Sequence, residues 1–158
     1  MLTDTVLDHA WIAGHIPHQG RMCLLDWVES WSEHGIQCRA NSHRASDNPL
    51  RAHGRLGAAC AIEYAAQAMA AHGALLAPPD SASARVGYLV SVRGARLHVS
   101  RLDDIAADLR IEATCITHNE NHILYQFSVS AAGRLLVDGR AAVVLDADGH
   151  VPISGATP

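Results

Sequence analysis

The chain has 158 residues, of which 49% are apolar, and a formal net charge of −4 at pH 7. This length favours one domain with its own core, since domains cluster at roughly 100–150 residues. The acidic balance and the scattered arginines, which do not alternate with aromatic residues, argue against a nucleic-acid partner.

The sequence shows no pattern typical of a secretory signal, a membrane span or a disulfide framework. The N-terminal stretch MLTDTVLDHAWIAG carries two aspartates and no basic region ahead of an apolar core, so it does not resemble a secretory signal. No charge-free run reaches the roughly 20 residues that a membrane span needs. The four cysteines lie far apart without a Cys-x-x-Cys pair, which favours free thiols in the core. We therefore expect a cytoplasmic protein.

Eleven histidines raise the question of a metal site, but their spacing does not predict one. His15 and His18 bracket Pro17, which breaks the helix that would align them. His118 and His122 flank a turn-like Asn-Glu-Asn, and the chain has no His-Glu-x-x-His motif. We expect neither a metal nor a bound cofactor.

The first half of the chain predicts a short helix and a hairpin. The stretch TVLDHAWIAGHIP indicates a short helix that stops before Pro17. Residues 22–43 alternate apolar and polar side chains on both sides of a break at Ser-Glu-His-Gly, which predicts two paired strands. A polar, proline-bearing loop follows over residues 44–55.

Residues 57–76, GAACAIEYAAQAMAAHGALL, predict one long helix that ends before APPDSASA. A helix packed on one sheet face normally shows a polar stripe on its other side. This segment has none, because only Glu63, Tyr64, Gln67 and His72 interrupt its apolar residues. We therefore expect a curved antiparallel sheet wrapped around this helix.

The rest of the chain is strand-like over residues 85–101, 108–118, 122–131 and 134–146, with turns at HNEN and AAGR. Alternation predicts an inward-facing set: Leu109, Ile111, Ala113, Phe127 and Val129. The predicted fold is a single α+β domain over residues 1–158, with its core at about 12–146 and a frayed C-terminal tail. Unpaired sheet edges would favour a dimer.

Glu63 and Gln67 stand four residues apart, hence on one helix face. A carboxylate in an apolar setting is expected to have a raised pKa and to act as a proton donor. Two other readings stay open: Glu63 can reach solvent from the first helical turns, and Gln67 can serve only to hold Glu63 in place.

Gly54 and Gly57 precede the helix, where free N–H groups of the first turn can hold an anion or the carbonyl oxygen of a thioester. Gly57 and Ala58 are therefore candidate substrate-binding residues. The glycines can equally be ordinary loop residues.

Two motifs resemble a known family. IPHQGRMCLLDWV (Ile16–Val28) and IEYAAQAMAAHGAL (Ile62–Leu75) are similar to the opening and the central helix of hotdog-fold 3-hydroxyacyl-acyl carrier protein dehydratases. The nearest members are the dehydratase-like proteins of aryl-polyene pigment clusters, and the resemblance extends in outline over residues 12–146.

The resemblance implies a hotdog dimer that removes water from a 3-hydroxyacyl thioester in fatty acid or polyene synthesis. The acyl group is carried on the phosphopantetheine of an acyl carrier protein, or on coenzyme A. In the family a histidine takes the C2 proton, an acid on the central helix protonates the departing hydroxyl, and backbone N–H groups at the helix start polarise the thioester. Glu63 matches the acid by motif.

The histidine of the family's loop has no counterpart, because this loop reads SDNPLRAHG, with Asn48-Pro49 at the expected place. His53, ten residues before Glu63, and His18 of the opening motif are the alternative bases. Asn48 and Gln67 complete the candidate substrate-binding set. A structural role remains open for each histidine.

Three functions follow as hypotheses: a dehydratase with Glu63 as general acid, a hotdog acyl thioesterase, and a non-catalytic subunit that binds acyl chains or pairs with an active dehydratase. The chain can form a homodimer or a heterodimer with another hotdog protein. An acidic carrier protein would dock on basic residues. The candidates are Arg39, Arg44, Arg51, Arg55, Arg93, Arg96 and Arg101.

Overall fold

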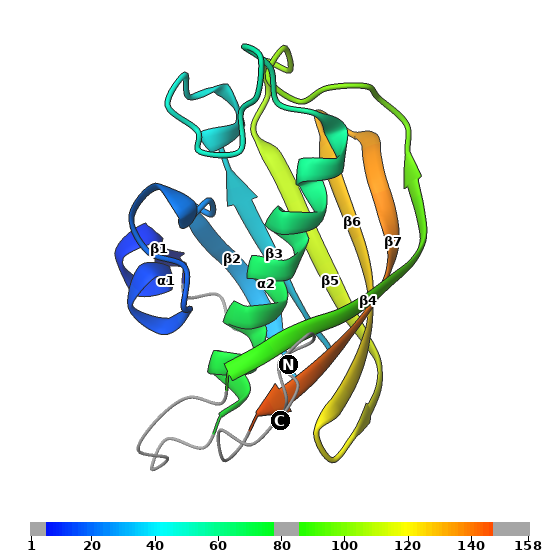
Figure 1. Ribbon diagram of the computed structural model, residues 1–158. Helices are drawn as coiled ribbons and strands as arrows, with labels where there is room; N and C mark the ends of the chain where they lie inside the picture. Colours follow the sequence, from blue (N-terminus) through cyan, green and yellow to red (C-terminus); the bar gives the residue numbers. More distant parts are fainter. Residues whose placement is uncertain (1–5, 78–85, 147–158) are drawn as a thin grey trace, which may run out of the picture.

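The computed structural model describes residues 6–77 and 86–146. Its seven strands form one antiparallel sheet in the order β1-β2-β3-β5-β6-β7-β4, with a long helix across one face (Figure 1). The strands are β1 (Leu7–Asp8), β2 (Trp27–Ser32), β3 (Gly35–Ala40), β4 (Val86–Leu97), β5 (Leu109–Asn119), β6 (His122–Ala131) and β7 (Arg134–Asp146). The predicted curved antiparallel sheet around one central helix is confirmed.

The predicted N-terminal helix is α1 (His9–His15). Asp8 caps it, because its carboxylate accepts a hydrogen bond from the Trp11 N–H at 2.9 Å. Extended backbone at Ile16, which precedes Pro17, ends it. A loop and the 3-10 turn η1 (Gly20–Met22) then lead to the sheet. This loop carries His18 over the long helix.

The predicted hairpin is formed by β2 and β3, which pair from Trp27 opposite Arg39 to Ser32 opposite Gly35. After β3 the chain passes through a second 3-10 turn, η2 (Ser42–Arg44), and an irregular loop to residue 57. This loop packs against the start of the long helix.

The long helix, α2 (Ala61–Leu76), is preceded by the 3-10 turn η3 (Ala58–Cys60). The helix therefore starts later than expected. The cause is a bridge between Gly57 and Arg101, in which the Ala58 N–H donates to the Ser100 carbonyl at 3.1 Å and holds the backbone extended at Gly57.

Strands β5, β6 and β7 form a meander with tight turns, as predicted from HNEN and AAGR. Glu120, Ala132 and Gly133 have positive φ in these turns. The predicted inward-facing set is confirmed, because each member is at most 1% exposed and belongs to the core beneath α2: Leu109, Ile111, Ala113, Phe127 and Val129.

Two features differ from or lie beyond the predictions. The short strand β1 was not predicted, since two residues carry no alternation to read. The predicted C-terminal tail, residues 147–158, lies outside the described residues. In the described part of the chain, no helix combines the length and hydrophobicity needed to cross a membrane.

Candidate active site

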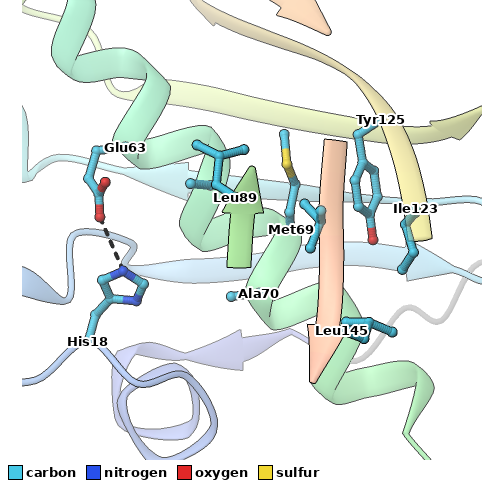
Figure 2. A pocket seen from close by; sticks show the side chains of 11 residues that line it. His18, Glu63, Met69, Ala70, Leu89, Ile123, Tyr125 and Leu145 are labelled. Atoms are coloured by element: carbon cyan, nitrogen blue, oxygen red, sulfur yellow. Dashed lines mark ion pairs between the residues drawn. The ribbon is translucent and has the colours of Figure 1, made fainter. Parts of the chain in front are cut away.

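His18 and Glu63 face each other at one end of a cavity (Figure 2). His18 Nε2 lies 3.1 Å from Glu63 Oε1. Glu63 comes from the first turn of α2, and His18 from the loop after Pro17. Both side chains are partly exposed, at 26% for His18 and 34% for Glu63. The structure thus brings together one candidate base and the candidate acid within a single chain.

Glu63 is a carboxylate in this arrangement, which corrects the expected raised pKa. The hydrogen bond from His18 lowers the pKa of the Glu63 carboxyl, and this effect outweighs partial burial, which acts to raise it. A contact from Gln67 lowers the pKa further. The raised pKa is expected only for an isolated acid, and Glu63 is paired with His18.

The Gln67 side chain connects Glu63 to the loop that carries His18. Its Nε2 donates to the Met22 carbonyl at 2.6 Å and to Glu63 Oε1 at 3.3 Å, and its Oε1 accepts from the Leu24 N–H at 2.8 Å. The side chain is fully buried. Gln67 therefore contacts Glu63, as expected of a residue that holds the acid in place, and its amide is hydrogen-bonded to the protein on both sides.

The other ring nitrogen of His18, Nδ1, is buried without a hydrogen-bond partner among the described residues. A buried nitrogen without a partner is costly. In the described part of the chain, the contact with Glu63 is the only polar contact of the His18 ring. That contact directs Nε2 at the carboxylate.

An apolar cavity of about 140 Å³ extends from the His18–Glu63 pair along α2. Its walls are Ala66, Met69, Ala70 and Gly73 of the helix, Leu89 of β4, Ile123 and Tyr125 of β6, and Val143 and Leu145 of β7. Small residues on α2 leave the space open. The cavity has the polar pair at one end and Tyr125 well away from it (Figure 2).

Asn48 and His53 are not part of this cavity. Asn48 is buried, and its Nδ2 donates to the Ser42 carbonyl at 2.9 Å and to the Tyr64 hydroxyl at 3.2 Å. His53 is exposed in the tight turn between Ala52 and Arg55, with φ of 53°. Within one chain, the structure does not bring either side chain to Glu63.

The Ala58 N–H, a candidate donor to a thioester carbonyl oxygen, is already hydrogen-bonded within the chain. The Ala58 N–H donates to the Ser100 carbonyl, and Gly57 precedes the turn in extended conformation. Ala58 is thus not available in this chain to polarise a thioester. Among the described residues, no group of three His, Cys, Asp or Glu side chains forms a metal-binding arrangement.

One long helix, α2, with an acid on its first turn and a curved antiparallel sheet packed against it, is the arrangement of a hotdog fold. The chain belongs to the ApeP-like dehydratase family, whose model matches residues 11–150. No curated protein sequence matches the chain.

Two solved structures illustrate the range of the fold. The dehydratase heterocomplex ApeI:P from Xenorhabdus doucetiae is 22% identical, with a TM-score of 0.76 over 87% of this chain and 92% of that chain. The thioesterase HI1161 from Haemophilus influenzae is 12% identical, with a TM-score of 0.65 over 96% of this chain and 100% of that chain. At these identities the similarity establishes the fold.

Proposed function

We propose that the chain is a dehydratase of 3-hydroxyacyl thioesters carried on the phosphopantetheine of an acyl carrier protein. The observation that carries the proposal is the His18–Glu63 pair at the end of an apolar cavity, in a member of the ApeP-like dehydratase family. The reaction moves one proton between two substrate atoms. It therefore requires no cofactor beyond the phosphopantetheine that carries the acyl group.

Glu63 performs both proton transfers in this proposal. Its carboxylate accepts the C2 proton, and the C2–H electron pair becomes the new double bond as the C3–O bond breaks. Glu63, now a neutral acid, gives the same proton to the departing hydroxyl, which leaves as water. The lowered pKa of Glu63 supports the first step, because a base must be ionised before it accepts a proton. Glu63 remains the acid of the second step.

His18 orients the carboxylate by donating its Nε2–H. His18→Gln is expected to retain activity within about 10-fold of wild type, since the glutamine amide can donate in place of Nε2, whereas His18→Ala is expected to lose about 100-fold. Rates of enoyl formation by the two variants measure the difference. Equal and complete loss in both variants would show that the imidazole itself takes the C2 proton.

A thioesterase is the second candidate, favoured by the ionised state of Glu63, which suits activation of water. Offering matched 3-hydroxyacyl and saturated acyl thioesters separates the two functions. We expect an enoyl thioester from the first substrate and no free thiol from either. Release of thiol from the saturated substrate would establish hydrolysis instead.

We also propose that a second hotdog chain pairs along β4. This strand is the last in the sheet and exposes Leu89, Val90 and Leu97 at 40%, 55% and 52%. An exposed apolar edge strand is a template for pairing. The partner can be a second copy or a different hotdog protein, as in the ApeI:P heterocomplex. Co-purification with another hotdog protein, and no activity when alone, would favour the non-catalytic subunit.

Docking of an acidic carrier protein requires basic residues that are not already paired within the chain. Four of the candidate arginines lie in ion pairs within the chain: Arg39 with Glu29, Arg44 with Asp108, Arg96 with Asp138 and Arg101 with Asp103. The other three, Arg51, Arg55 and Arg93, have no ion pair among the described residues, but Arg51 donates to the Ala45 and Gly54 carbonyls. Arg55 and Arg93 are therefore the better candidates to meet an acidic carrier.

A further inference from the structure

A buried hydrogen-bond network lies at the end of the cavity away from the His18–Glu63 pair. His72 of α2 is fully buried, and its Nδ1 lies 2.7 Å from the hydroxyl of Tyr125. Its Nε2 lies 2.8 Å from the Ser32 carbonyl of β2. The proposed dehydration uses none of these three groups.

The donor and acceptor of each hydrogen bond in this network follow from the chemistry of the groups. A carbonyl oxygen only accepts, so His72 Nε2 carries the hydrogen and donates to Ser32. Burial lowers the pKa of His72, which keeps the ring neutral and leaves Nδ1 as an acceptor. Tyr125 must therefore donate its hydroxyl hydrogen to His72. Burial also raises the pKa of Tyr125, so the hydroxyl stays protonated.

The Tyr125 hydroxyl can therefore act toward a guest only as a hydrogen-bond acceptor. Its hydrogen is taken by His72, while its oxygen retains lone pairs that can accept from a guest in the cavity that Tyr125 lines. The neighbouring walls are apolar, formed by residues such as Met69, Ile123 and Leu145 (Figure 2). A guest that donates a hydrogen bond finds its acceptor here, whereas a guest that only accepts finds none.

The size of the cavity fixes which part of a guest reaches Tyr125. A cavity of about 140 Å³ is close to the roughly 150 Å³ that holds one benzene molecule in an engineered apolar core. The space therefore takes a short acyl group. With the thioester end of that group at Glu63, its far end lies near Tyr125.

We propose that Tyr125, held by His72, is a specificity-determining residue that favours acyl groups bearing a hydroxyl at the far end over those ending in a methyl group. The inference rests on the proposed function for the identity of the guest as an acyl thioester. It adds to that function a selection for the group at the far end of the acyl chain, the end that does not react.

The test is a binding comparison with three non-hydrolysable acyl-pantetheine amides of equal chain length. They end in a methyl, a hydroxyl or a methyl ether, and calorimetry gives the dissociation constants. We expect wild type to bind the hydroxyl compound about five-fold more tightly than the other two, as for one added hydrogen bond. The methyl ether keeps the oxygen but has no hydrogen to donate.

Tyr125→Phe is expected to bind all three compounds equally. Tyr64→Phe is the matched control, because Tyr64 is also a buried tyrosine of the core, bonded to Ser42 and Asn48, and does not line the cavity. The control is expected to keep the five-fold preference, which separates specificity from a general loss of packing.

Equal binding of the three compounds by wild type, or a preference that survives in Tyr125→Phe, would overturn the inference and leave the proposed function intact. Binding of none of the compounds would instead contradict the acyl-thioester function itself, and the inference with it.

Discussion

Replacing Glu63 with glutamine is expected to reduce dehydration by a factor of roughly 10²–10⁴, the usual contribution of a positioned acid–base group. Glutamine has nearly the same shape but neither accepts nor returns a proton. Among the described residues that line the cavity, Glu63 is the only carboxylate, and the polar groups in contact with it are His18 and the amide of Gln67. Steady-state enoyl formation measures the effect.

The fold should survive this replacement. Glu63 is 34% exposed, and its ion pair with His18 lies at the surface end of the cavity, where such pairs contribute little to stability. Thermal unfolding should therefore give similar midpoints for both proteins. Full activity in a folded Glu63→Gln variant would rule out Glu63 as the proton carrier.

Replacing Gln67 with leucine is expected to lower the free energy of unfolding by about 2–4 kcal/mol. The change leaves the Leu24 N–H and the Met22 carbonyl without their partner, and each unsatisfied buried group costs about 1–3 kcal/mol. Urea denaturation of both proteins gives the difference. Activity should fall as well, because the loop from Pro17 to Leu24 carries His18.

Gln126→Leu is the matched control for this change. Gln126 lies on β6 with its side chain on the sheet face opposite α2, where it is partly exposed. Its replacement should alter the free energy of unfolding by less than about 0.5 kcal/mol, as is usual for surface positions. Equal losses for the two variants would mean that the Gln67 contacts do not hold the loop.

The fold was predictable because its elements are marked locally. The alternation of β5 and β6 assigned the buried residues, and the lack of a polar stripe on α2 indicated a wrapped helix. The start of α2 was not predictable, since it depends on the bridge between Gly57 and Arg101, which lie far apart in sequence. Single-residue patterns cannot report such a pairing.

The site was only partly predictable for the same reason. The motifs identified Glu63 and His18, but the sequence did not choose between His18 and His53, which differ in that His53 sits in an exposed turn. The lowered pKa of Glu63 depends on a contact between two separate segments. Tyr125 escaped notice because it lies on an ordinary core-facing strand position and joins the cavity only through the fold.

Hydrogen exchange at C2 of the substrate reports directly whether Glu63 carries the proton in dehydration. A saturated 3-hydroxyacyl carrier thioester, incubated with the protein in deuterated water and recovered, is examined by mass spectrometry for deuterium at C2. We expect deuterium with wild type, through reversal of the dehydration, and none with Glu63→Gln. Exchange at the wild-type rate in the folded Glu63→Gln variant would contradict this expectation, because the C2 proton would then be taken by another group.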